Sequence, residues 1–239
     1  MIDHVHDLAS VREATDRLLG AATLLDNAAV AAPSRLPGWS RGHVLAHIAR
    51  NADALVNVLE GRPMYPDART RDADIERDAP RALDAHLADV RNTADRFQHS
   101  AAVPADWNRV VTMRNGVTDM AARLPFRRLI EVELHHVDLG LDRDLEDLSE
   151  EFTLREIAFL AERFSGNPDI PPLALGTPGG GPDGHVWHTG RTEGAEDAEG
   201  TRLSVTGPAA DLMGWLAGRR DGAALECSGG GRLPVLPPL

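Results

Sequence analysis

Histidines and glutamates at helical spacing are the residues of this sequence that could do chemistry. The chain has 10 histidines in 239 residues, and histidine is the commonest metal ligand in proteins. His47 lies in one amphipathic segment, and Glu131 and His135 lie four residues apart in a later one. Because residues four apart share a helix face, these two side chains could bind one ion. With His47 from a facing helix they would leave one coordination position open, as in catalytic zinc sites.

A second pair in the later segment, Glu133 and His136, competes for the same role. These residues are three apart and also share one face of a helix. The segment is apolar on two sides, so its periodicity does not decide between the two pairs. Without a metal, the same residues would form a solvated charged face beside a half-buried, hydrogen-bonded histidine.

The earlier segment separates its two histidines more clearly. A buried stripe repeats at helical spacing, and His47 lies at its edge, one turn from Asn51. At about 100° per residue, His43 lies nearly opposite the stripe. We therefore interpret His43 as a solvated surface residue and expect His47 to face a cleft between helices. The stripe consists of Leu45, Ile48, Ala52, Leu55 and Leu59.

The composition excludes several classes of protein. The 25 basic and 37 acidic residues give a net charge of −12, which disfavours binding to nucleic acids and to anionic membranes. Every basic residue is arginine, so Schiff-base chemistry on lysine and a phosphate-binding P-loop are excluded. The single Cys227 excludes an internal disulfide and a cysteine-rich zinc site. With no signal segment and no long apolar run, we expect a cytoplasmic protein.

Four helical segments of similar length are predicted to position the histidines. They cover about residues 5–27, 41–60, 80–100 and 121–141, with Ser40 as the cap of the second. Between the last two, Asn115-Gly116 marks a hairpin turn within residues 108–119. Helices of this length joined by short links predict a four-helix bundle.

After about residue 150 the sequence changes character. A helix at 153–164 is followed by short apolar runs that we interpret as strands, and by a short helix at 209–218. The predicted fold class is α+β, with residues 1–150 forming the helical bundle and residues 151–239 forming a small α+β domain. The strands are expected at 173–175, 185–188, 203–206 and 224–227, and glycine-rich turns or loops at 176–184 and 229–231.

Four short motifs are found along the chain. They are PGWS at 37–40 before the helix of His47 and Asn51, PMY at 63–65 with Arg69, the pattern Glu-x-x-x-His-x-x-Asp at 131–138, and WLAGR at 215–219. In order, spacing and two-domain layout they resemble the mycothiol-dependent maleylpyruvate isomerase family. That family belongs to the DinB-like metal-binding helical bundles and carries a small C-terminal domain similar to sterol-carrier modules.

The resemblance implies a zinc ion on His47, Glu131 and His135, with water completing the shell, and it selects the pair four residues apart. It also implies mycothiol as the thiol cofactor and the cis–trans isomerisation of maleylpyruvate to fumarylpyruvate in gentisate degradation. Rotation about a C=C bond requires a nucleophile that adds and later leaves, and zinc would deprotonate the thiol. Because carboxylates pair well with guanidinium groups, we expect Arg219 to be catalytic and substrate-binding, and Arg69 to bind substrate as well.

Two alternative functions stand beside this one. The chain could be another mycothiol-dependent S-transferase of the same family, or a zinc-binding or sensing module without turnover. As an isomerase, its partners would be mycothiol and a small dicarboxylate-like substrate. We expect a monomer or a weak homo-oligomer.

Overall fold

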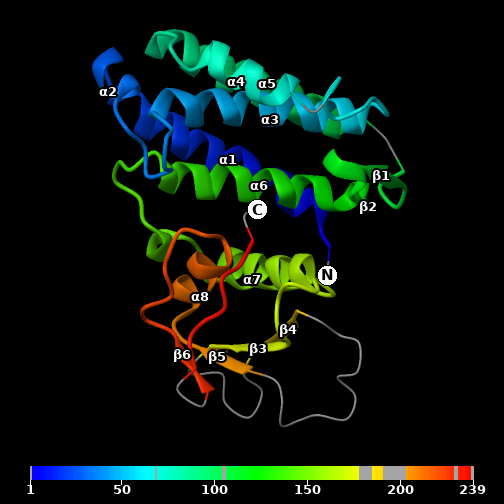
Figure 1. Ribbon diagram of the computed structural model, residues 1–239. Coiled ribbons are helices and arrows are strands. Elements are labelled where there is room, and N and C mark those ends of the chain that lie inside the picture. The colour runs from blue at the N-terminus through cyan, green and yellow to red at the C-terminus, as the bar shows by residue number, and fades with distance from the viewer. Residues whose placement is uncertain are drawn as a thin grey trace. The chain divides into compact units, whose positions relative to one another are not determined.

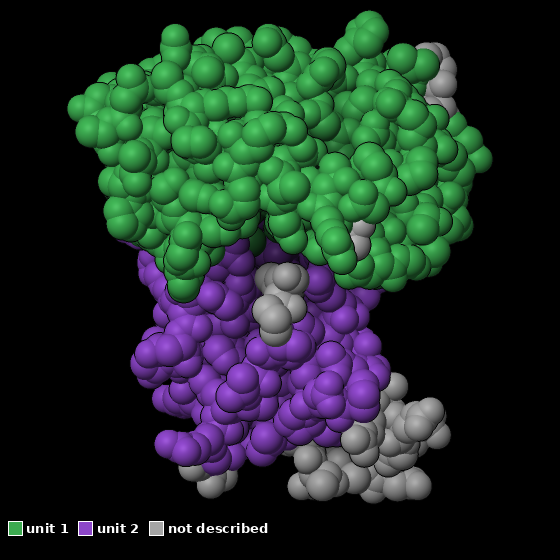
Figure 2. All heavy atoms as spheres, turned by 45° about the horizontal axis from the view of Figure 1, so that its top comes forward, with its two compact units in different colours: residues 1–143 green, residues 144–239 purple. Residues whose placement is uncertain are grey.

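The chain divides into two compact units, residues 1–143 and 144–239, coloured separately in Figure 2. The computed structural model describes residues 2–67, 69–103, 106–177, 185–190, 203–228 and 231–237. The sequence-based boundary after residue 150 lies at the first turn of α7 (Glu150–Phe164), a helix that belongs to the second unit. No helix among the described residues is long and apolar enough to span a membrane.

The first unit is a four-helix bundle, as the helical spacing predicts (Figure 1). Its long helices are α1 (His4–Ala22), α3 (Arg41–Leu59), α5 (Leu83–Ala102) and α6 (Leu124–Asp138). α3 packs against α5 and α6, and α1 packs against the same two helices, so the four form a closed ring. The apolar stripe of α3, Leu45, Ile48, Ala52 and Leu55, is buried in the middle of this ring.

The start of α3 corrects the prediction for His43. Ser40 caps the helix as expected, accepting a hydrogen bond from the His43 backbone N–H at 3.4 Å. The His43 ring returns the contact, because its Nδ1 accepts from the Ser40 backbone N–H at 3.2 Å. This reciprocal capping box holds the ring against the helix end. His43 is therefore half-buried and occupied with capping rather than being a solvated surface residue.

Two short helices of the first unit are absent from the sequence-based prediction. They are α2 (Asn27–Ala31) and α4 (Thr70–Asp78). α4 has almost no apolar periodicity, since only Ile75 and Asp78 are buried. It lies along α3, where Gly42 permits close approach: a Cβ on Gly42 would lie 2.2 Å from the Ala79 carbonyl oxygen.

The predicted hairpin is present between α5 and α6. Strands β1 (Val110–Thr112) and β2 (Thr118–Met120) pair antiparallel. The short 3₁₀ turn η1 (Arg114–Gly116) joins them, and both Asn115 and Gly116 have positive φ angles, of 59° and 74°. These are the two residue types that adopt this backbone most readily. A second 3₁₀ turn, η2 (Ala121–Arg123), then leads into α6.

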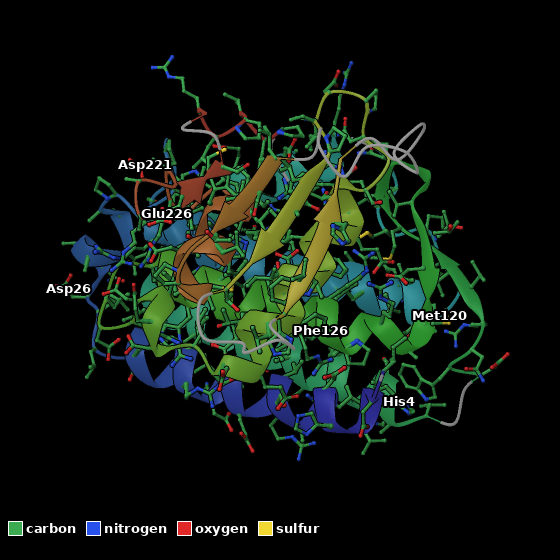
Figure 3. All side chains as sticks on the ribbon, turned by 90° about the horizontal axis from the view of Figure 1, so that it is seen from below. His4, Asp26, Met120, Phe126, Asp221 and Glu226 are labelled. Carbon is green, nitrogen blue, oxygen red and sulfur yellow. The ribbon has the colours of Figure 1, made fainter. Side chains whose placement is uncertain are left out.

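The second unit is a small sheet with helices. Its strands β3 (Leu173–Gly176), β4 (Val186–Thr189), β5 (Leu203–Thr206) and β6 (Glu226–Cys227) lie in the order β4-β3-β5-β6. Among these strands, β3 and β5 pair parallel, and the pairs β3–β4 and β5–β6 are antiparallel. Glu226 marks edge strand β6 in Figure 3.

The second unit also contains the two helices that the sequence predicts, at nearly the predicted bounds. α8 (Ala209–Leu216) packs against α7 and against the 3₁₀ turn η3 (Leu145–Asp147), and α7 also contacts β4. The whole chain is thus α+β, as predicted. Most of the two glycine-rich stretches predicted as loops, residues 178–184 and 229–230, lie outside the described residues.

Candidate metal centre

Three side chains that the sequence singles out meet between α3 and α6. His47 Nε2 lies 2.9 Å from Glu131 Oε2, and His135 Nε2 lies 3.2 Å from the same oxygen. One ligand atom from each residue lies within 4.8 Å of the others, and this is the one such group of histidine, cysteine and carboxylate residues in the described ranges. The two imidazole rings meet edge to face at 4.5 Å.

The local sequence explains why these side chains converge. Glu131 and His135 are one helical turn apart on α6, which packs directly on α3. His47 lies beside the buried stripe of α3, and its side chain is only 6% exposed. Trp39, from the loop before α3, lies against it with ring centroids 5.6 Å apart. The PGWS motif therefore supplies both a helix cap and one wall of the site.

Asp138 sets the orientation of His135. Its carboxylate oxygen Oδ2 lies 2.8 Å from His135 Nδ1, and its side chain is completely buried. With Nδ1 engaged by this carboxylate, Nε2 is the ring nitrogen that faces Glu131. A carboxylate behind a ligating histidine is the usual outer partner at zinc sites, where it fixes the ring and raises its basicity.

The three central groups shift one another's proton affinities. Burial opposes the charge on Glu131, but hydrogen bonds from His135 and His47 hold its pKa well below the usual range. Burial and the neighbouring His135 lower the pKa of His47 to about 4. Burial also acts against charge on His135, yet its bonds to Asp138 and Glu131 outweigh this and raise its pKa. A carboxylate and a neutral imidazole, the ligand forms that metals require, are thus already present.

The donor set fits a zinc ion with an open position. Two imidazole nitrogens and one carboxylate oxygen form the ligand set of many catalytic zinc sites, where a fourth position takes water or substrate. The Glu131 side chain is 32% exposed, so solvent reaches the cluster through this residue. Neither histidine shares this access, because both rings are buried.

The competing pair on α6 has a different environment. Glu133 accepts hydrogen bonds from Arg17 at 2.8 Å and from Arg143 at 2.9 Å, so its charge is neutralised away from the cluster. His136 is buried, and neither of its ring nitrogens has a hydrogen-bond partner among the described residues. Burial and the nearby Arg143 lower its pKa to about 4. The structure therefore brings the pair Glu131 and His135 to His47 and leaves the pair Glu133 and His136 apart from it.

Two arginines near the cluster were not found by sequence reasoning. Arg128, one turn before Glu131, is fully buried and donates to the Ile48 carbonyl and to Asn51 Oδ1, both at 2.8 Å. Burial lowers its pKa to about 10, while Glu131 acts to raise it. A cation inside the apolar stripe of α6 is the signal that could have identified it. Arg71 Nη2 donates to His47 Nδ1 at 3.4 Å, and it was missed because α4 was missed.

The two predicted substrate-binding arginines are each described within their own unit. Arg69 precedes α4 and is exposed, and its backbone N–H donates to Asp67 Oδ1 at 2.8 Å. Arg219 follows α8 in the second unit and donates to the Ala217 carbonyl at 2.6 Å. It lines a cavity of about 520 Å³ formed by residues 215–221 and 233–237. A substrate-binding role for either arginine stays a prediction.

Comparisons with known proteins place this geometry in context. The model of the mycothiol maleylpyruvate isomerase N-terminal domain matches residues 11–140, and that of the corresponding C-terminal domain matches residues 147–238. A crystal structure of the mycothiol-dependent maleylpyruvate isomerase is similar over 99% of this chain and 97% of that one, with 24% identity and a TM-score of 0.84. A histidine-to-alanine mutant of that enzyme matches over the same shares, with 23% identity and the same TM-score. No curated protein sequence matches the chain.

Proposed function

Because the chain belongs to the mycothiol maleylpyruvate isomerase family, we propose that it is a zinc- and mycothiol-dependent enzyme that isomerises maleylpyruvate to fumarylpyruvate. The proposed ligands are His47, Glu131 and His135. We place the reaction in the cytoplasm, because a thiol cofactor requires a reducing compartment.

The observation that carries this proposal is the His47–Glu131–His135 cluster itself. A purely structural role would not explain why a carboxylate lies between two buried imidazoles. As a ligand set, the same group has a low-pKa carboxylate, a neutral histidine and a second histidine oriented by Asp138. The open side at Glu131 provides the access that turnover needs.

Each residue then has a defined task. When bound, the zinc ion supplies a cationic centre that favours a thiolate, and mycothiol supplies the nucleophile whose reversible addition permits rotation about the C=C bond. His47 and His135 would hold the ion, and Asp138 keeps the His135 ring in position. Arg128 balances the Glu131 charge from the bundle interior. Arg219, and secondarily Arg69, would bind substrate carboxylates.

The direct test follows fumarylpyruvate formation by the zinc-loaded protein, with and without mycothiol. Turnover that requires mycothiol supports the proposal. Transfer of the thiol to an electrophile without isomerisation would instead indicate an S-transferase, and zinc binding without either reaction would indicate a non-catalytic module. Each of the last two results contradicts the proposed reaction.

A variant pair tests the role of Arg219. Loss of a charge-assisted contact to the reacting substrate is worth roughly 2–4 kcal/mol, so Arg219→Met should reduce kcat/KM by about 30- to 1,000-fold at unchanged zinc content. Arg219→Lys should recover little, because a point charge does not replace a two-pronged donor. The exposed Arg232 offers the control substitution Arg232→Met. A change below about threefold for Arg219→Met would refute the assignment.

A further inference from the structure

Arg71 and Tyr65 form a polar pair directly behind the proposed metal ligands. Arg71, in the first turn of α4, donates through Nη2 to His47 Nδ1 at 3.4 Å. The Arg71 guanidinium also lies close enough to the Tyr65 hydroxyl to act against the rise in its pKa. Both residues belong to the segment that follows α3, and α4 lies along α3. The packing of α4 on α3 thus delivers a guanidinium to the ring of a proposed ligand.

The hydrogen bond from Arg71 to His47 requires a free lone pair on Nδ1, which the metal-free histidine provides. In that state His47 Nε2–H donates to Glu131 Oε2 at 2.9 Å, and the lone pair of Nδ1 is available to the guanidinium. When Nε2 ligates a metal, its lone pair is used and the ring hydrogen of a neutral imidazole resides on Nδ1. An N–H of Arg71 would then face an N–H of His47. With a metal on His47, the Arg71 guanidinium would therefore lose this hydrogen bond and could donate to a different acceptor.

The other partners of Arg71 do not use up its five donors. Nη1 donates to Asp72 Oδ1 at 2.7 Å, but that carboxylate is 61% exposed, and exposed pairs contribute little. Burial raises the pKa of Tyr65, with Arg71 opposing, so the phenol keeps its proton and can donate. The Arg71 side chain is 21% exposed. Two donors, one of them cationic, are therefore available beside the ligands.

A cavity next to Tyr65 provides space for a ligand. It has a volume of about 670 Å³ and lies between the loop after α3 and the β1–β2 hairpin. A volume of this size accommodates small organic molecules. Its walls include Met64, Tyr65 and Asp67 from the loop and Val111 and Met113 from the hairpin. Tyr65 thus lines the cavity and is also an electrostatic neighbour of Arg71, the residue that contacts His47.

We propose that Arg71, assisted by the Tyr65 hydroxyl, is a carboxylate-binding residue of the first unit and selects anionic substrates for the zinc site. The inference rests on the proposed function, and it adds Arg71 to the arginines proposed to bind substrate. A guanidinium binds a carboxylate through two parallel hydrogen bonds, which a neutral thiol body cannot provide.

The test measures binding of maleate, a dicarboxylate, to the zinc-loaded protein by calorimetry in the absence of thiol. Arg71→Met should weaken maleate binding by roughly 10- to 150-fold, the range for a hydrogen bond to a charged group. Arg71→Lys should recover little of this loss, and Tyr65→Phe should cost several-fold. Arg91→Met, which replaces an exposed arginine of α5, is the control and should bind like the wild type. Zinc content should be the same in all variants.

The outcomes separate this inference from the proposed reaction. Wild-type affinity in Arg71→Met, an equal loss in Arg91→Met, or no maleate binding by the wild type would each overturn it. If the wild type binds maleate through Arg71 but does not isomerise maleylpyruvate, the carboxylate site stands and the proposed reaction fails. If Arg71→Met is poorly folded, as judged by its thermal unfolding, the comparison of Arg71→Lys with Arg91→Met decides.

Discussion

Replacing Asp138 by asparagine tests whether the cluster is organised as a metal centre. The substitution keeps the shape of the side chain and an oxygen that can accept from His135 Nδ1, so it removes little besides the negative charge. The contact is 2.8 Å long and the carboxylate is fully buried, so solvent does not screen it. If His135 ligates zinc, the lost charge reduces the basicity of the ring and destabilises the bound ion.

The size of the effect follows from the contact. A hydrogen bond to a charged group contributes roughly 1.5–3 kcal/mol, and a neutral acceptor retains part of that. Substitution of outer partners of ligating histidines costs about 10- to 100-fold in metal affinity, equivalent to roughly 1.4–2.7 kcal/mol. We therefore expect Asp138→Asn to weaken zinc binding by about 10- to 100-fold, measured by competition with a chromogenic chelator at pH 7.

A second buried carboxylate supplies the control. The side chain of Asp78 is 1% exposed and pairs with Arg50, Arg77 and Arg81. Asp78→Asn should lower the thermal stability of the chain and leave zinc affinity within about twofold of the wild type. Equal zinc affinity in Asp138→Asn and the wild type would show that His135 is not a ligand held by Asp138. An equal loss in both variants would attribute the effect to general destabilisation.

Three further predictions concern the individual ligands and their neighbours. His47→Ala should lose zinc, as measured by elemental analysis, whereas His43→Ala should keep it but lose about 1 kcal/mol of stability in urea titrations because the α3 capping box opens. Glu131→Gln should lose zinc under the same dialysis in which Glu133→Gln retains it, and the reverse result would transfer the site to the other pair. His136 titrates at about 4 when folded and near 6.5 when unfolded, so its contribution to stability is present above pH 6.5 and is lost as the pH falls. Between pH 7 and pH 5, the free energy of unfolding should therefore fall by about 2 kcal/mol less in His136→Leu than in the wild type. An equal fall in both proteins would show that His136 is not the source of this pH dependence.

The fold class and the main helices and strands could be predicted from the sequence alone. Helical periodicity and the cap at Ser40 predict α3, and Asn115-Gly116 predicts the hairpin, because these signals depend on contacts within a few residues along the chain. α4 was not predicted, because it lacks a local signal of this kind. Its polar sequence has no periodic stripe, and the helix is held along α3 by tertiary packing.

The site divides in a similar way. Spacing alone left Glu131 with His135 and Glu133 with His136 as equal candidates, because both pairs share a helix face and α6 is apolar on two sides. A local pattern does not specify which face meets which neighbour, and the packing of α6 between α3 and α1 decided it. One face of α6 turns Glu131 and His135 toward His47, and another turns Glu133 toward Arg17 of α1. Tertiary packing likewise places Arg71 and Arg128 near the cluster. Arg71 contacts His47, 24 positions away in the chain, and Arg128 contacts Asn51, 77 positions away. Such long-range contacts depend on how whole helices pack, which the spacing of residues along one segment does not record.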